Sequence, residues 1–149
     1  MDYEPTDILL VEDEAAHAEL TERAIRKAGN ANRVQIVTDG EEAFDYLYNR
    51  GKYKDKVKYP MPGLILLDIK LPGIDGIEVL KKIKENPNLK QIPVIMLTTS
   101  EREEDVVRSY EHYANSYLTK PVGFKAFEEK IAQVDFYWMI LNKPPVIQD

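Results

Sequence analysis

The sequence predicts an α/β protein in which a doubly wound, five-stranded parallel sheet carries helices on both faces. Leu64–Asp68 begins with four large apolar residues in a row, the pattern of a strand buried on both sides. Five such strand candidates alternate with five helix candidates, which favours parallel strands joined by right-handed crossovers. The chain has 149 residues, of which 44% are apolar and 31% charged, so we expect a single domain over residues 1–149.

Each strand candidate is a short apolar run that stops at polar or turn-forming residues. The first stops at the consecutive carboxylates Glu12–Glu14, and the second gives way to Asp39 and Gly40. The central run ends on a carboxylate, Asp68, before a loop begins. In chain order the candidates are Ile8–Val11, Val34–Thr38, Leu64–Asp68, Pro93–Leu97 and Ser116–Thr119.

Apolar residues recur at helical spacing in the segments that follow the strand candidates. The first helix candidate ends at Gly29, and the third ends near Pro87. The fourth, Glu103–Tyr113, is only weakly apolar, and the last is predicted to be an extended C-terminal helix over Phe124–Leu141. The residues that mark the first three are Leu20, Ala24, Ile25 and Ala28, then Ala43, Phe44 and Leu47, then Ile77, Leu80 and Ile83.

A long basic loop, Asn49–Gly63, precedes the central strand. Its cations stand against a single Asp55 and are Arg50, Lys52, Lys54, Lys56 and Lys58. We expect a solvated connection, because charge runs are usually solvated, and a docking patch for a partner is the alternative.

Composition and charge exclude several classes of function. The net charge of −6 argues against nucleic acid or an anionic membrane as the main partner. The absence of cysteine excludes disulfides, thiolate catalysis and zinc–thiolate sites, and two histidines are too few for a histidine-rich metal centre. The N-terminus does not resemble a signal peptide, and no apolar run approaches membrane-spanning length. We therefore expect a cytoplasmic protein.

Polar side chains that follow different strands should meet, because the carboxyl ends of parallel strands lie at one edge of the sheet. These residues are Glu12 and Asp13, then Asp68, Thr98 and Lys120. Three carboxylates in one cleft repel one another unless a cation relieves the repulsion. The oxygen ligands of Asp13 and Asp68 suit Mg²⁺, a hard ion that keeps part of its hydration shell.

The same edge suits a phosphoryl group. A metal ion and the Lys120 ammonium would neutralise its oxygens, and the Thr98 hydroxyl would donate a hydrogen bond to one of them. A carboxylate is the only suitably placed nucleophile, and aspartyl phosphate is a known covalent intermediate.

Four segments, in order and at these spacings, carry a family resemblance. They are Leu9–Glu14, Leu66–Gly76, Pro93–Thr98 and Tyr117–Pro121. Together they resemble the receiver domain of two-component response regulators, relatives of CheY, over about residues 7–133. The resemblance implies a flavodoxin-like fold with strand order 2-1-3-4-5, and residues 134–149 then form a helical extension and tail.

The resemblance also implies roles for residues at the sheet edge. Asp68 would take a phosphoryl group from the phosphohistidine of a sensor histidine kinase. Asp13, Asp68 and the backbone carbonyl of Lys70 would bind Mg²⁺, and Glu12 would act through water. Lys120 would contact the phosphoryl group.

Two further residues would form the switch. Thr98 would move onto the phosphate and Tyr117 would swing inward, remodelling the face that includes the fourth helix and fifth strand. Such a protein is a phosphoacceptor and not an enzyme with a separate substrate, although it catalyses its own phosphoryl transfer and slow self-dephosphorylation.

Residues 134–149 are too few for a DNA-binding or enzymatic output domain, so we expect a stand-alone regulator that signals by binding proteins. Apolar residues in the last helix recur at alternating steps of three and four, and residues 136–141 are apolar all round. We expect a homodimer through Phe136, Trp138 and Leu141, with a tail that folds back on its own domain as the alternative.

The basic loop and aromatic tail are similar to the small regulators that partner cyanobacterial phytochrome kinases. This resemblance implies a light-sensing or related soluble sensor as the kinase. It does not identify the downstream target.

The predicted fold is compatible in outline with three other functions. A phosphatase of the haloacid dehalogenase type needs a second acid two residues after its nucleophile, where this chain has Lys70. A flavodoxin-like flavin carrier needs a phosphate-binding loop after the first strand, where Glu12–Glu14 would repel the phosphate. A constitutive adaptor that keeps the receiver fold without phosphorylation is the alternative that stays open.

Lys70 places a long cation beside Asp68, where its side chain would shield an acyl phosphate from water. The variant Lys70→Ala should therefore lose its phosphoryl group faster than the wild type. The decay of the phosphorylated species, followed by intact mass, measures this lifetime. An unchanged lifetime would remove the shielding role.

Overall fold

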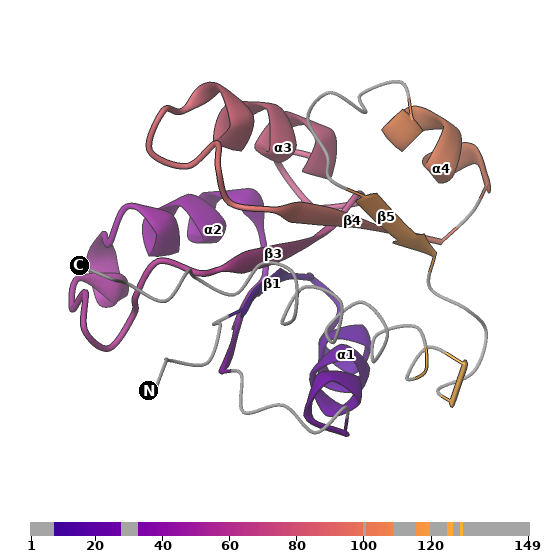
Figure 1. The fold of residues 1–149 in the computed structure, drawn as a ribbon, viewed down its shortest axis with the longest axis horizontal. Coiled ribbons are helices and arrows are strands. Elements are labelled where there is room, and N and C mark those ends of the chain that lie inside the picture. Colours follow the sequence, from indigo (N-terminus) through magenta and orange to yellow (C-terminus); the bar gives the residue numbers. More distant parts are fainter. Residues whose placement is uncertain are drawn as a thin grey trace, which may run out of the picture.

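Five parallel strands form one sheet in the order β2-β1-β3-β4-β5 (Figure 1), as the family resemblance implied. The computed structural model describes residues 8–27, 33–99, 101–108, 116–119, 125–126 and 129. The strands are β1 (Ile8–Val11), β2 (Val34–Val37), β3 (Leu64–Asp68), β4 (Val94–Thr98) and β5 (Ser116–Thr119). The helices are α1 (Ala15–Lys27), α2 (Gly40–Leu47), α3 (Gly76–Glu85) and α4 (Glu101–Arg108), with a short 3-10 turn η1 (Gly51–Tyr53). No helix within these ranges is both long and apolar enough to cross a membrane.

The predicted strands are confirmed, with shifts of one residue in β2 and β4. The first four predicted helices are confirmed within the described residues, and the predicted ends of the first at Gly29 and of the fourth at Tyr113 lie outside them. β4 includes Thr98 as its last residue, whereas the predicted strand stopped at Leu97. α4 begins at Glu101, before the predicted start at Glu103. The predicted last helix, Phe124–Leu141, lies outside the described residues except at positions 125, 126 and 129.

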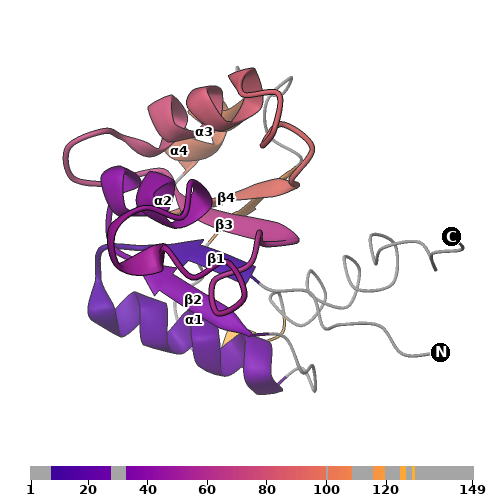
Figure 2. The same ribbon diagram turned by 90° about the vertical axis from the view of Figure 1, so that its left-hand side faces the viewer.

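The central strands are buried on both faces, which explains the unbroken apolar run in β3. Successive side chains of a strand point to opposite faces, so each strand supplies two separate cores. One core combines Leu9, Ile65, Leu67 and Met96 with Phe44 of α2 and Leu80 and Ile83 of α3. The other combines Ile8, Leu10, Leu66 and Ile95 with Ala18, Ala24 and Ile25 of α1. Figure 2 shows α1 on one side of the sheet and α2 and α3 on the other. Each fully buried Leu or Ile side chain stabilises the fold by about 1.5–3 kcal/mol.

The helices begin where short polar side chains cap them. Asp39 Oδ1 accepts a hydrogen bond from the amide of Glu42 at 2.7 Å, at the start of α2. Asp75 Oδ1 accepts one from the amide of Glu78 at 3.0 Å, at the start of α3. Each cap satisfies an amide that has no partner inside the helix, which sets the residue at which each helix starts.

The basic loop is anchored by tyrosines. Tyr53 is only 2% exposed, and its ring meets those of Tyr46 and Tyr59 edge-on at centroid distances of 5.2 and 5.0 Å. Asn49 takes a left-handed conformation with φ of 53°, and its amide donates hydrogen bonds to the backbone oxygens of Tyr53 and Tyr59. The loop lysines are nevertheless exposed, so the backbone is held while the charges remain in solvent.

Glu42 of α2 connects this loop to the sheet. The Tyr53 hydroxyl donates to Glu42 Oε2 at 2.5 Å, and the Lys52 ammonium lies 3.4 Å from the same oxygen. Burial by itself would raise the pKa of Glu42, but the hydrogen bonds from Tyr53 and Thr38 and the charge of Lys52 together lower it. Burial and the neighbouring Glu42 raise the pKa of Tyr53.

The lowered pKa of Glu42 has a consequence for stability against acid. Because the folded-state pKa lies below the ordinary value of 4.5, the ionised carboxylate stabilises the fold above that value, and this contribution is lost as the pH falls through the folded pKa. Glu42→Gln should lower the free energy of unfolding at neutral pH by about 1–3 kcal/mol. It should also flatten the loss of stability between about pH 5 and about pH 3, measured by chemical denaturation. The exposed neighbour variant Glu41→Gln is the control and should retain the wild-type pH profile; a wild-type profile in Glu42→Gln would contradict the prediction.

Candidate functional site

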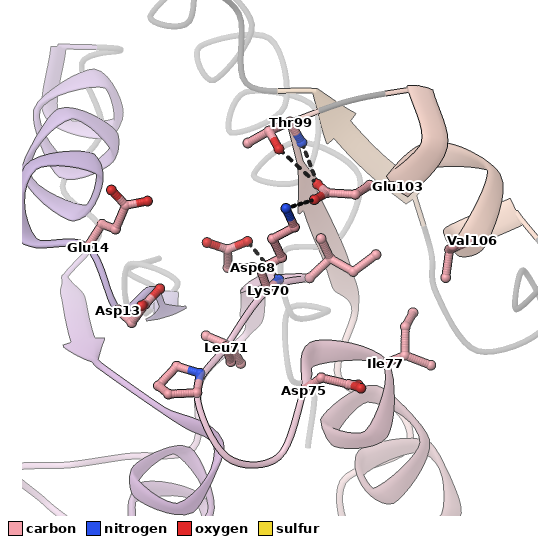
Figure 3. A pocket seen from close by; sticks show the side chains of 12 residues that line it. Asp13, Glu14, Asp68, Lys70, Leu71, Asp75, Ile77, Thr99, Glu103 and Val106 are labelled. Atoms are coloured by element: carbon pink, nitrogen blue, oxygen red, sulfur yellow. Dashed lines mark hydrogen bonds and ion pairs between the residues drawn. The ribbon is translucent and has the colours of Figure 1, made fainter.

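The site lies at the edge where β1, β3 and β4 end. Val11 and Leu67 are paired across β1 and β3, so the residues after them, Glu12 and Asp68, leave the sheet side by side. Asp13 follows directly after Glu12. Figure 3 shows Asp13 and Asp68 facing the same opening. The register therefore brings together the carboxylates that the sequence predicted.

These carboxylates form a compact cluster. One oxygen each from Glu12, Asp13 and Asp68 lies within 4.8 Å of the others. Glu12 is 1% exposed and Asp68 is 6% exposed, whereas Asp13 is open to solvent. Three negative charges at this separation repel strongly where water is largely excluded. Positive charge close to the cluster would relieve this repulsion.

A divalent cation fits this donor set. Carboxylate oxygens that converge at short range are the ligands that hard cations prefer, and the exposed side of Asp13 leaves room for bound water. Asp13 and Asp68 both contribute oxygens to this cluster, and Glu12 is its most buried member. Their predicted roles as ligands stay predictions. The predicted role of the Lys70 backbone carbonyl stays a prediction.

A cavity of about 680 Å³ opens over the cluster. It has an acidic end and an apolar wall. The acidic end is formed by Asp13, Glu14 and Asp68, and the wall includes Leu71, Ile77 and Val106. The cavity is large enough for a phosphoryl group and its donor, and Asp68 lines it.

Asp68 is fixed by the close approach of α3 to the end of β3. The amide of Gly76 donates to the Ile69 carbonyl at 3.0 Å, and the amide of Lys70 donates to Asp68 Oδ1 at 3.1 Å. A Cβ atom at position 76 would lie 2.3 Å from the Asp68 carbonyl oxygen. Only glycine allows the first residue of α3 to pack against this strand end.

Thr98, the last residue of β4, is fully buried and does not line the cavity, whereas Thr99 does. The next residue, Thr99, is held by Glu103 of α4. Glu103 Oε1 accepts hydrogen bonds from the amide and the hydroxyl of Thr99 at 2.7 and 3.1 Å. Glu103 Oε2 lies 3.3 Å from the Lys70 ammonium (Figure 3).

Glu103 is the site residue that the sequence interpretation missed. The available signal was the sequence Ser100–Glu103, because Ser-x-x-Glu before a helix is the pattern of a capping box. That pattern also predicts a helix start before Glu103, as the structure has it. The contact of Glu103 with Lys70 joins α4 to the loop after β3, and local sequence carries no information on it.

Several predicted site residues cannot be placed. Tyr117 lies in β5, paired with Met96, but its side chain is outside the described structure. Lys120 lies outside the described residues. The same holds for the predicted dimer residues Phe136, Trp138 and Leu141.

Comparison with known families and proteins supports the family resemblance that four segments of the sequence indicated. The response regulator receiver domain matches residues 8–132, most of the chain. The chain belongs to this family. The flavodoxin-like fold and the position of the acidic cluster at the carboxyl edge are therefore those of a receiver domain, and the family resemblance seen in the sequence is confirmed.

Two relatives match most of this chain and most of their own length. Response regulator Rcp1 of Synechocystis sp. (strain ATCC 27184 / PCC 6803 / Kazusa) is 42% identical over 91% of this chain and 90% of that protein. The probable methanogenesis regulatory protein FilR2 of Methanothrix harundinacea (strain 6Ac) is 39% identical over 95% of this chain and 89% of that protein.

Two solved structures of response regulators have the same fold as this chain. The Mn²⁺-bound form of Rcp1 superposes with a TM-score of 0.81 at 40% identity, covering 95% of this chain and all of that one. The phosphorylated cyanobacterial phytochrome response regulator RcpA gives a TM-score of 0.84 at 36% identity, covering 96% of this chain and all of that one. The resemblance of the sequence to phytochrome-type regulators is thus confirmed, because the phytochrome response regulator RcpA is among the similar structures.

Gly76 packs against Asp68, so a larger residue at position 76 should disturb the site as well as the fold. Gly76→Ala should lower the free energy of unfolding by about 1–3 kcal/mol, because the added methyl group has no space. It should also weaken Mg²⁺ or Mn²⁺ binding, measured by calorimetric titration, because the end of β3 must move.

Gly40→Ala is the matched control. A Cβ atom at Gly40 would lie 2.7 Å from Val79 Cγ2, so this variant strains the contact between α2 and α3 instead. It should lose stability and keep its metal affinity. Equal metal affinity in both glycine variants would contradict the positioning role of Gly76.

Proposed function

We propose that this receiver domain accepts a phosphoryl group on Asp68 from a sensor histidine kinase, with Mg²⁺ as cofactor, and signals through protein–protein contacts. The observation that carries the proposal is the cluster of Glu12, Asp13 and Asp68 at the edge of the sheet. Asp68 is the member of this cluster that ends the central strand, lines the cavity and is held in place by backbone contacts. It is therefore the carboxylate best positioned to act as a nucleophile.

The chemistry follows from these positions. A carboxylate oxygen of Asp68 attacks phosphorus, the P–N bond of the phosphohistidine breaks, and the imidazole leaves with the electron pair. The product is an aspartyl phosphate. Bound Mg²⁺ would offset the charge of the phosphoryl oxygens and of the neighbouring carboxylates. Asp13 and Asp68 would hold it, with the Lys70 carbonyl as a further ligand and Glu12 acting through water.

The remaining predicted residues take roles around the new group. The Lys120 ammonium would contact the phosphoryl oxygens, and the Thr98 hydroxyl would donate a hydrogen bond to one of them. Thr98 is buried at the end of β4 in the described structure, so its hydroxyl must turn or move to reach the group. Tyr117 would then swing inward from β5. Hydrolysis of the aspartyl phosphate would return the protein to its starting state.

The proposal includes partners. The likeness to RcpA and Rcp1 supports a phytochrome-type or related soluble kinase as the donor. FilR2, described as a probable methanogenesis regulatory protein, is nearly as similar to this chain. Overall sequence similarity therefore does not identify the signal that the kinase senses. We further propose that residues 1–149 act as a stand-alone regulator in the cytoplasm and form a homodimer through Phe136, Trp138 and Leu141. Neither nucleic acid nor membrane is a proposed partner.

Phosphorylation can be tested directly with acetyl phosphate and Mg²⁺. We expect the wild type to gain the mass of one phosphoryl group and Asp68→Ala to gain none. Size-exclusion elution of the same samples, and of samples with beryllofluoride, tests the homodimer. A phosphoryl gain without a change in elution would place the output on another protein. No gain and no response to beryllofluoride would leave a constitutive adaptor with a receiver fold.

Asp13→Ala separates the metal from the nucleophile. This variant keeps Asp68 but removes one carboxylate of the cluster, so it should bind Mg²⁺ more weakly and phosphorylate more slowly. Raising the Mg²⁺ concentration should restore part of the rate. Mg²⁺ affinity equal to that of the wild type would contradict the assignment of Asp13 as a ligand.

A further inference from the structure

Glu103 divides its carboxylate between two groups at the mouth of the site. Oε1 accepts the amide and hydroxyl hydrogen bonds of Thr99, and Oε2 pairs with the Lys70 ammonium at 3.3 Å. Lys70 follows the phosphoacceptor candidate Asp68 by two residues, Thr99 follows the buried Thr98, and Glu103 belongs to α4. One buried carboxylate thus connects the loop after β3, the end of β4 and the helix α4.

The two members of the ion pair differ in how easily they can move. The Lys70 side chain is 80% exposed and sits on a flexible stem, so changing its partner has a small cost. The Glu103 side chain is only 10% exposed, and a buried carboxylate that loses a positive partner is strongly destabilised. The pair can therefore be broken from the lysine side, and the consequence falls on Glu103 and α4.

We propose that Glu103 is a latch on α4 that a phosphoryl group on Asp68 releases by competing for the Lys70 ammonium. This inference rests on the proposed function, because it takes Asp68 as the site of phosphorylation. A phosphoryl group carries about −1.5 to −2 charges near pH 7, more than the single charge of the Glu103 carboxylate. Lys70 therefore shifts toward the phosphoryl group, and Glu103 loses this ion pair and shifts in response.

Movement of Glu103 also acts on its two hydrogen bonds with Thr99. Oε1 holds the amide and hydroxyl of Thr99 at the turn into α4, so a displaced carboxylate loosens that turn. Phosphorylation thereby changes the relative free energies of two states of α4, one held by Glu103 and one released. A switch requires such a difference. Glu103 is a positioning residue in this scheme, because it touches neither the phosphoryl group nor the metal.

The chain contains a second copy of this arrangement away from the site. Glu42 Oε1 accepts the amide and hydroxyl of Thr38 at 2.9 and 3.1 Å, and Glu42 Oε2 lies 3.4 Å from the Lys52 ammonium. The copy differs in one respect, because Glu42 Oε2 also accepts the hydroxyl of Tyr53. Neither Glu42 nor Lys52 lines the cavity over Asp68. Lys52 is therefore a matched control for Lys70.

The test is amide hydrogen exchange over residues 99–108, with Mg²⁺, in the presence and absence of beryllofluoride. Binding of beryllofluoride is checked separately for each protein by fluorine NMR. In the wild type we expect beryllofluoride to raise exchange in α4 by about fivefold or more, the lower end of typical allosteric coupling. In Lys70→Met and in Glu103→Gln we expect exchange to be raised already without beryllofluoride, and to change by less than about twofold when it binds. Lys52→Met should respond like the wild type.

The outcomes separate the latch from the proposed function. If beryllofluoride binds the wild type but does not change exchange in α4, the latch is overturned and phosphorylation is left in place. The same conclusion follows if Lys70→Met and Glu103→Gln bind beryllofluoride and respond as fully as the wild type. Failure of the wild type to bind beryllofluoride would overturn both. A variant that does not bind it is judged on its exchange without it, which must be raised if the latch exists. Lys70 is exposed, so Lys70→Met is not expected to disturb the fold.

Discussion

The repulsion among the carboxylates of Glu12, Asp13 and Asp68 is the constraint on which the site depends. The strands β1 and β3 are buried on both faces and held in register, which fixes where Glu12 follows β1 and where Asp68 ends β3. The fold thus stores unfavourable electrostatic energy at one edge and creates a demand for positive charge there. A divalent cation would meet this demand, and it would also offset the negative charge of a phosphoryl group.

The backbone around Asp68 gives this electrostatic arrangement its precision. Gly76 lets α3 start in contact with the strand end, and the Lys70 amide orients the Asp68 carboxylate. Movement of the strand end by a fraction of an ångström would change both metal binding and nucleophilic attack, since both depend on the direction of the carboxylate oxygens. The packing of helix on strand is therefore part of the chemistry of the site.

Two helices of this receiver begin with the same Thr–Glu–Lys arrangement but are anchored differently. At α2, Glu42 is held by the buried Tyr53 in addition to Thr38 and Lys52, and Tyr53 is packed among other tyrosines. At α4, Glu103 contacts Thr99 and the exposed Lys70, which lies two residues after Asp68. Tyr53 thus adds a buried contact at α2, and the Glu103 contact at α4 is the one that lies beside Asp68.

The sequence by itself determined the alternation of strands and helices, the strand ends to within one residue, and the position of Asp13, Asp68 and Thr98 at or just after those ends. These follow from local patterns, because a buried strand reads as an apolar run and the first polar residue marks its end. The strand order of the sheet, in contrast, was predicted from the family resemblance. The tertiary structure decided the contact between Lys70 and Glu103, the clash that requires glycine at position 76 and the tyrosine packing that anchors the basic loop. Each of these depends on which distant segments touch, and periodicity along the chain holds no record of contacts between elements.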